Sequence, residues 1–345
     1  MKALIIAPAW IGDTVMAQAL FMRLQQYTPG LQLDALAPPW VAPVLERMPQ
    51  IGRVIESPFA HGEFALRARY RLARMLAQGA YQRAYLLPNS LKSALIPALA
   101  GIPERIGFTG EARYALVNRR HTLDEAALPQ MSERFAQLAE PVGAAVPLPL
   151  PLPRLSSSSG QQAATLAALQ LARPEKIAVF CPGAEYGPAK RWPERHFAAL
   201  ADELIRRGYG VWLLGSGKDR AVGDGIVRLA AAAAPLNLCG STSLAQAIDL
   251  IAAASVVVCN DSGLMHVAAA LARPLVAVYG SSSPAFTPPL SAEARIISLN
   301  LECSPCFARV CPLGHFDCLN KLEPARVLEA CLTASRGAAP AGIYP

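Results

Sequence analysis

Residues 256–270 read Val-Val-Val-Cys-Asn-Asp-Ser-Gly-Leu-Met-His-Val-Ala-Ala-Ala, an apolar run followed by a short polar turn and an alanine-rich segment. The β-branched run predicts a buried strand over 256–259, and the alanine-rich segment predicts a helix over 264–272. The turn holds Asp261, Ser262 and Gly263. The unpaired N–H groups and positive dipole end of a helix that begins there suit a phosphate, although an ordinary capped helix has the same pattern.

A second predicted junction of strand and loop carries positive charge. The strand expected over 177–180 runs into residues 181–193, Cys-Pro-Gly-Ala-Glu-Tyr-Gly-Pro-Ala-Lys-Arg-Trp-Pro, where glycine and proline favour a loop and Lys190 and Arg191 are adjacent cations. The chain contains no Walker A motif and no well-formed G-x-G-x-x-G fingerprint after a strand. The two junctions therefore predict a different kind of site for a phosphorylated ligand.

Short apolar runs alternate with helical patterns along the chain, which predicts α/β architecture with parallel sheets. Ligands then bind beyond the carboxyl ends of the strands. A proline-rich stretch at 147–153 and a serine-rich stretch at 156–160 separate two halves. The further expected strands are 4–7, 33–36, 84–87, 211–214 and 275–279, and the further expected helices are 13–26 and 194–207. We predict a domain over 1–160, a linker over 161–175, a domain over 176–322, and a C-terminal helix and tail over 323–345.

The composition excludes several classes of protein. With 53% hydrophobic and 17% charged residues, a chain of 345 residues is expected to be globular, and no apolar run is long enough for a membrane span. The first residues are interrupted too early for a signal peptide, so a cytoplasmic protein with mostly reduced cysteines is expected. The net charge of +7 suits nucleic acid, an anionic membrane surface or an acidic substrate. Since the chain lacks an aromatic-interleaved basic stripe, nucleic acid is not an expected partner.

Several segments in order resemble the ADP-heptose:lipopolysaccharide heptosyltransferases, which are inverting glycosyltransferases of GT-B fold. The resemblance extends to about residue 300 and is carried by residues 1–16, 87–94, 182–193, 260–266 and 279–289. It implies two Rossmann-like domains facing each other across a cleft, and it is strongest with members that add the second heptose of the inner core. The implied reaction transfers L-glycero-D-manno-heptose from ADP-heptose to the first heptose of heptosyl-Kdo2-lipid A, without a cofactor or metal. The implied location is cytoplasmic and peripheral, at the inner leaflet of the inner membrane.

The resemblance also implies roles for single residues. Asp13, which follows Gly12, would be the general base that deprotonates the acceptor hydroxyl; an isolated aspartate there would be interpreted as a helix cap. Lys190 would contact the donor phosphates with support from Arg191, and Asp219 would lie near the donor ribose. The backbone donors and imidazole that would neutralise the ADP leaving group belong to Asp261, Ser262, Gly263 and His266.

Other polar residues are candidates for the acceptor. Asn89, Ser90 and Lys92 follow a predicted strand end and are expected, with Gly12 and Arg113, to contact the lipid-linked core oligosaccharide. A basic segment is either a solvated helix face or a surface for an anionic glycolipid or membrane; it contains Arg67, Arg69, Arg71 and Arg74.

Some alternatives stay open. The chain could add the first heptose or a later one, could be a nucleotide-sugar epimerase of similar architecture, or could bind a nucleotide without catalysis. Four cysteines with His315 nearby could hold a structural metal, but their spacing is not that of a zinc ribbon, and unliganded thiols are the preferred interpretation. They are Cys303, Cys306, Cys311 and Cys318.

Overall fold

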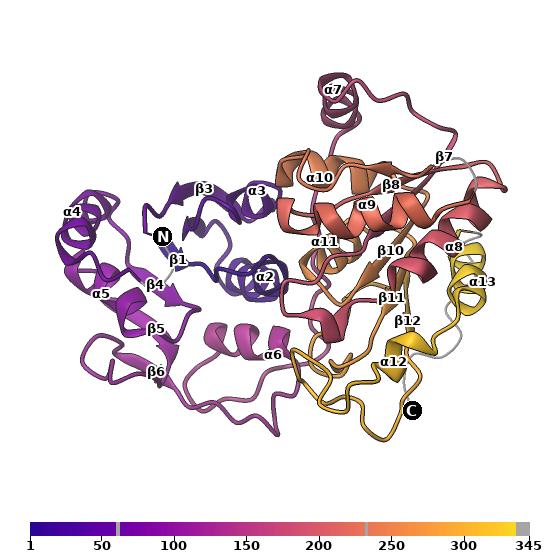
Figure 1. Cartoon of the computed structure of the whole chain (residues 1–345). Helices are drawn as coiled ribbons and strands as arrows, with labels where there is room; N and C mark the ends of the chain where they lie inside the picture. The colour runs from indigo at the N-terminus through magenta and orange to yellow at the C-terminus, as the bar shows by residue number, and fades with distance from the viewer. Residues whose placement is uncertain (60–62, 232–233, 336–345) are drawn as a thin grey trace. The chain divides into compact units, whose positions relative to one another are not determined.

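The computed structural model describes residues 1–59, 63–231 and 234–335. The chain divides into two compact units, Met1–Pro153 and Arg154–Pro345, and each unit is built on one six-stranded sheet (Figure 1). All neighbouring strands in both sheets are parallel. The predicted α/β class with two Rossmann-like domains is therefore confirmed.

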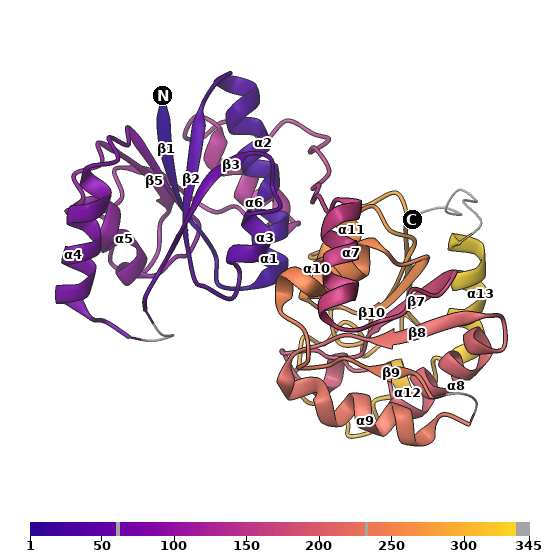
Figure 2. The same ribbon diagram turned by 90° about the horizontal axis from the view of Figure 1, so that it is seen from above.

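The first unit contains strands β1 (Lys2–Ile6), β2 (Gln32–Ala37), β3 (Ile51–Glu56), β4 (Arg83–Leu86), β5 (Glu104–Phe108) and β6 (Arg119–His121). Its helices are α1 (Ile11–Met16), α2 (Gln18–Tyr27), α3 (Ala42–Leu45), α4 (Leu66–Ala77), α5 (Leu91–Leu99) and α6 (Met131–Ala136). The strand order is β3-β2-β1-β4-β5-β6. Figure 2 shows α4 and α5 on one face of this sheet and α1, α2, α3 and α6 on the other, which is why the apolar residues of β1 are buried.

The second unit contains strands β7 (Lys176–Cys181), β8 (Tyr209–Leu213), β9 (Leu236–Asn237), β10 (Val256–Asn260), β11 (Leu275–Val278) and β12 (Ala294–Ile297), in the order β12-β11-β10-β7-β8-β9. Its helices are α7 (Ser159–Ala168), α8 (Glu194–Ile205), α9 (Arg220–Leu229), α10 (Leu244–Ala252), α11 (Gly263–Ala270), α12 (Asp317–Asn320) and α13 (Pro324–Ala334). Phe197 of α8, Ile226 of α9 and Val327 of α13 share one apolar core with Phe180 of β7. In Figure 2, α7, α10 and α11 lie on the opposite face of the sheet.

The predicted helix over 13–26 is two helices. The first begins at Ile11, and the chain turns at Ala17 before α2 begins at Gln18. Trp10 is the N-cap residue of α1, so Asp13 lies inside the first turn and is not the cap. The alternative that Asp13 serves as a helix cap is therefore wrong.

The boundary between the units falls between Pro153 and Arg154. Helix α7 occupies most of the segment predicted as a linker, and its Thr165 Oγ1 donates a 2.9 Å hydrogen bond to Asp249 Oδ2 of α10. The segment thus packs as part of the second unit. Helix α13 lies in the predicted C-terminal segment, whereas residues 336–345 of the predicted tail lie outside the described residues.

Candidate active site

In both sheets the strand order reverses between two central neighbours, β1 and β4 in the first unit and β7 and β10 in the second. Ligands of open α/β sheets bind at the carboxyl ends of such strands because the following loops diverge there. The loops after β7 and β10 carry most of the predicted donor residues, and those after β1 and β4 carry Asp13 and most of the acceptor candidates. We describe the two edges in turn.

Lys190 and Asp261 meet at the edge of the second sheet. Lys190 ends the short 3₁₀ turn Pro188–Lys190, and its Nζ lies 2.5 Å from Asp261 Oδ2. The side chains are 18% and 5% exposed, and Nζ also lies 5.0 Å from the centre of the Tyr186 ring. The loops after β7 and β10 therefore place one ammonium group beside the start of α11.

Among the described residues, the N-terminal turn of α11 has no side-chain cap from its N-cap residue and is partly exposed. Ser262 is the N-cap residue, yet its side chain makes no capping hydrogen bond within the described residues, and the Asp261 carboxylate is directed to Lys190 instead. Ser262 and Gly263 are partly exposed. The first N–H groups of a helix have no partner within it and carry the positive end of its dipole. This turn, with Lys190, can therefore bind a diphosphate.

His266 lies one turn further along α11 and is only 4% exposed. Its pKa is lowered to about 4, mainly by burial, with Asp261 partly opposing the change and Lys190 adding to it. The imidazole is therefore neutral at pH 7 and can donate a hydrogen bond but adds no positive charge. A neutral imidazole brings no charge to a leaving group, so we revise the expectation that His266 neutralises it; the positive groups beside it are the Lys190 ammonium and the N-terminal end of the helix dipole.

Asn260 was not predicted as a site residue. Its fully buried side chain donates a 2.7 Å hydrogen bond from Nδ2 to the carbonyl of Pro182 and accepts one of 3.1 Å at Oδ1 from the N–H of Trp192. The loop of residues 182–192, which contains Lys190, is thus fastened at both ends to β10. In the sequence this asparagine resembles an ordinary turn residue.

Asp219 and Arg191 also lie around this loop. Ser216 donates to Asp219 Oδ2 from its N–H at 2.9 Å and from its Oγ at 2.8 Å, and a methyl group on Gly183 would lie only 2.4 Å from Asp219 Cγ. The carboxylate thus lies between the loops after β7 and β8, and its contact with the donor ribose stays a prediction. Arg191 donates from Nη2 to the carbonyl of Ala184 at 3.3 Å, so it contacts its own loop.

At the edge of the first sheet, Asp13 lies in the first turn of α1 and is partly exposed. The surrounding protein disfavours the charged carboxylate and raises its pKa from 3.8 to about 6. Gly12 precedes it in the same turn. A carboxylate with such a pKa is ionised at neutral pH and is a stronger proton acceptor than an ordinary aspartate.

The structure gives Arg113 a role different from the predicted one. Its side chain is 1% exposed and donates to the carbonyls of Pro88 and Phe108, both at 2.7 Å, and to Asn89 Oδ1 at 2.9 Å. We therefore correct the expected acceptor contact: Arg113 builds the loop after β4. Ser90 caps α5 by accepting from the N–H of Ser93 at 3.3 Å, and Lys92 is partly exposed in the first turn of that helix.

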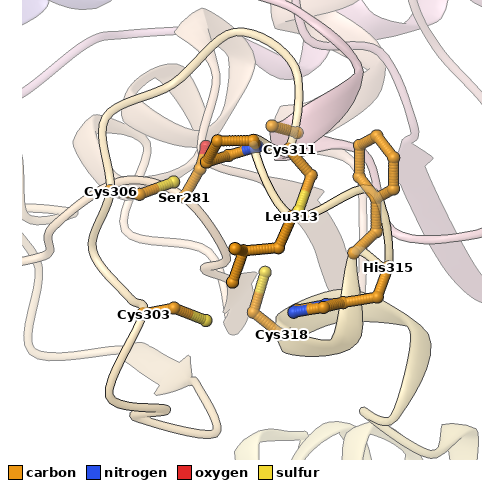
Figure 3. A pocket seen from close by; sticks show the side chains of 10 residues that line it. Ser281, Cys303, Cys306, Cys311, Leu313, His315 and Cys318 are labelled. Carbon is orange, nitrogen blue, oxygen red and sulfur yellow. The ribbon is translucent and has the colours of Figure 1, made fainter.

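The four cysteines line one small pocket together with Ala189, Ser281 and His315 (Figure 3). Within the described ranges, no group of three His, Cys, Asp or Glu side chains is arranged to hold a metal ion. The segment of residues 303–318 instead packs against the Lys190 loop. Tyr186 Oη donates to the carbonyl of Phe307 at 2.6 Å, and the N–H of Ala189 donates to the carbonyl of Arg309 at 3.1 Å.

Comparison with known proteins gives a consistent result. Residues 69–317 match the pattern of glycosyltransferase family 9 (heptosyltransferase). The chain is 47% identical to lipopolysaccharide heptosyltransferase 2 of Escherichia coli (strain K12), over 95% of this chain and 97% of that protein. It is 45% identical to lipooligosaccharide heptosyltransferase 2 of Haemophilus influenzae, over 87% and 89% of the two proteins. The solved structure of E. coli ADP-heptose lps heptosyltransferase II is similar with a TM-score of 0.88 at 44% identity, over 98% of this chain and 99% of that chain.

Gly187 provides a test of the Lys190 loop. It has φ +154°, and a methyl group there would lie 2.5 Å from the carbonyl oxygen of Arg309. We expect Gly187→Ala to displace the loop and raise the Kd for ADP about tenfold, as a local strain of ~1–3 kcal/mol predicts. Gly160→Ala in α7, whose nearest neighbour would be 3.9 Å away, is the control and should leave the Kd unchanged. Calorimetric titration measures both, and an unaltered Kd for Gly187→Ala would show that the loop does not depend on this contact.

Proposed function

The chain belongs to glycosyltransferase family 9, the heptosyltransferases, and on this premise we propose that it transfers L-glycero-D-manno-heptose from ADP-heptose to the first heptose of the lipopolysaccharide inner core. Identity of 47% to the E. coli heptosyltransferase 2 over almost the whole chain supports this acceptor. The assignment of the donor rests on one observation: Lys190 and Asp261 form an ion pair beside the first turn of α11, which has no side-chain cap in the described part of the chain. That arrangement suits a nucleoside diphosphate.

In the proposed complex, the diphosphate accepts hydrogen bonds from the N–H groups at Ser262 and Gly263 and from the Lys190 ammonium group. Asp261, which pairs with Lys190 in the structure, keeps the ammonium positioned before the donor binds. Asp219 accepts hydrogen bonds from the ribose hydroxyls, and His266 donates one hydrogen bond as a neutral imidazole. Arg191 stabilises the loop by donating a hydrogen bond to the carbonyl of Ala184.

Asp13 is the proposed base. Its carboxylate takes the proton from the acceptor hydroxyl as the hydroxyl oxygen attacks the anomeric carbon of the heptose. The bond between that carbon and the diphosphate oxygen breaks, the configuration inverts, and ADP leaves with the electron pair. Positive charge at Lys190 and the helix dipole stabilise the leaving diphosphate as its charge develops.

Replacing Lys190 tests the donor site. We expect Lys190→Gln to raise the Kd for ADP at least tenfold, because one partly buried charge-assisted contact is lost. Lys218→Gln is the matched control, since Lys218 pairs with Glu185 in the same unit but its side chain is 74% exposed. That variant removes the same charge and should bind ADP normally. Equal Kd values for both variants would remove Lys190 from the proposed site.

Replacing Asp13 tests the mechanism. Asp13→Asn keeps the shape of the side chain and removes the base, so kcat should fall ~10²-fold or more while the Kd for ADP stays constant. In the native enzyme, kcat/KM should fall as the pH drops through about 6, where the carboxyl becomes protonated. A kcat near normal for the variant, or an acid limb near pH 4 for the native enzyme, would contradict this role.

The same variant has a predicted effect on stability. Because the folded pKa of Asp13 is raised, its favourable contribution is complete below 3.8 and is lost as the pH rises through about 6. At neutral pH the ionised group therefore destabilises the fold, and Asp13→Asn should melt at an equal or higher temperature. A lower melting temperature at neutral pH would show that loss of activity reflects damage to the fold.

The other functions considered predict different results in one assay. An epimerase would convert ADP-heptose without any acceptor, and a binding module would convert nothing. A member that adds another heptose would prefer an acceptor of a different core length. Transfer to acceptors of defined core length, measured beside an acceptor-free control, therefore distinguishes all four.

We also propose that the first unit contacts an anionic membrane surface through helix α4. The exposed face of this helix combines three arginines, Arg67, Arg71 and Arg74, with exposed Leu66, Tyr70 and Met75. A helix face that combines cationic side chains with aromatic and aliphatic ones suits the surface of an anionic bilayer. No helix among the described residues is long and apolar enough to span a membrane, so contact of the proposed kind would be peripheral.

Arg69 does not belong to this face, which corrects the interpretation of a four-arginine segment. Its side chain is buried, donates to the carbonyls of Phe64 at 2.6 Å and Lys92 at 3.2 Å, and lies over the Phe59 ring at 4.1 Å. Arg69 thus fixes α4 to its neighbours.

The exposed arginines can be tested with vesicles. We expect Arg67→Ser/Arg71→Ser to weaken binding to phosphatidylglycerol-rich vesicles roughly thirtyfold, since each of the two basic groups near such a surface contributes ~1 kcal/mol. The difference should shrink as salt rises. The matched control is Arg206→Ser/Arg207→Ser after α8, which removes the same charge from exposed positions. If both double variants bind vesicles equally, or if only the KM for a lipid-free acceptor changes, the arginines do not form a membrane contact.

A further inference from the structure

Two tryptophans stand exposed at the edge of the first sheet. Trp10 follows β1 and is 58% exposed, and Trp40 follows β2 and is 48% exposed. The other two tryptophans of the chain, Trp192 and Trp212, are 1% and 3% exposed. Indole rings are normally well buried because they carry a large apolar area. Two exposed ones on neighbouring strand ends therefore indicate a binding surface.

The two tryptophans belong to loops that are joined. Strands β1 and β2 are paired, with Ile6 opposite Leu36. Beyond their ends, Trp40 Nε1 donates a 2.8 Å hydrogen bond to the carbonyl of Ala9, the residue before Trp10. Trp10 itself is the N-cap residue of α1, and its carbonyl accepts from the N–H and Oγ1 of Thr14, both at 2.9 Å. Both positions are therefore fixed by ordered contacts.

The same loops carry the proposed base. Asp13 lies in the first turn of α1, three residues after Trp10, so the proposed base and this indole are both attached at the N-terminal end of α1. The exposed arginines of α4 lie elsewhere, because α4 covers the face of the sheet opposite α1 (Figure 2). The tryptophan edge is thus distinct from the surface proposed for membrane contact.

We propose that Trp10 and Trp40 form an aromatic platform that holds the acceptor sugar with its hydroxyl near Asp13. A pyranose ring has apolar faces of C–H groups and a rim of hydroxyls. An indole can cover such a face while the hydroxyls stay available for hydrogen bonds and for reaction. Aromatic side chains provide this contact area at low cost in conformational entropy. The proposal rests on the transferase function given above and assigns residues that recognise its sugar acceptor.

Other occupants fit less well. Lipid head groups of an anionic membrane would meet the carboxylate of Asp13 here, which is the wrong sign of charge. The adenine of the donor is expected in the second unit, with Lys190 and Asp219. A sugar ring is uncharged on its faces and must reach Asp13 to react.

The test uses a lipid-free acceptor saccharide and four variants of the full chain. We expect Trp10→Ala and Trp40→Ala each to raise the acceptor KM about tenfold, with the Kd for ADP and the melting temperature unchanged. Trp40→Phe, which keeps a ring but loses the N–H, should recover most of the affinity. Tyr27→Ala is the control, because Tyr27 is a 48% exposed aromatic residue at the end of α2 of the same unit. It should leave this KM unchanged.

Binding without turnover gives an independent measurement. Addition of acceptor should change the tryptophan fluorescence of the native protein, and Trp10→Ala/Trp40→Ala should abolish the change. Acceptor KM values within about twofold of native for both single variants would overturn the platform, as would a loss confined to ADP or vesicle binding. If the native enzyme shows no transfer at all, the proposed function fails instead. The two failures are therefore distinguishable.

Discussion

The reversal of strand order in each parallel sheet determines where the chemistry can occur. At β7 and β10 the chain leaves in opposite directions, and one buried side chain at the end of β10, Asn260, joins β10 to the loop that follows β7. Its amide uses both its donor and its acceptor to hold the loop of residues 182–192. Loss of one such buried hydrogen bond commonly costs ~1–3 kcal/mol, because the remaining partner is left unpaired. The position of Lys190 beside Asp261 therefore depends on a residue that need not touch the donor.

The sequence predicted the central strands well and the peripheral ones poorly. The apolar runs of β1, β7, β10 and β11 are buried from both sides, so their composition alone identifies them. The unpredicted β6 reads Arg-Arg-His and lies at a sheet edge, while β9 has only two residues. The break at Ala17 was missed because alanine there continues a helical pattern. Both sheets share one strand order although the sequence shows no repeat, since many apolar patterns support the same packing.

For the site, the motifs predicted which residues come together but not how each is used. Lys190 and Asp261 lie 71 positions apart in the sequence, and the structure brings them to 2.5 Å. Three other assignments changed because they depend on burial, which no local pattern reports. Arg113 and Arg69 point inward to backbone carbonyls, and His266 is buried and neutral. Asn260 and the two exposed tryptophans were missed for the same reason, because their roles depend on burial and hydrogen-bond partners that the sequence does not report.

The features that we assign to function have one property in common: each lowers the stability of the folded chain. The carboxylate of Asp13 is desolvated, the indoles of Trp10 and Trp40 are exposed, and the first turn of α11 lacks a side-chain cap. Each is destabilising by itself, and each lies at the carboxyl edge of a sheet. Proteins retain such features where binding or catalysis needs them, because stability elsewhere offsets the loss. In this chain we attribute the compensating stability to the fully buried central strands. They allow the loops to carry desolvated, exposed or uncapped groups until substrates bind.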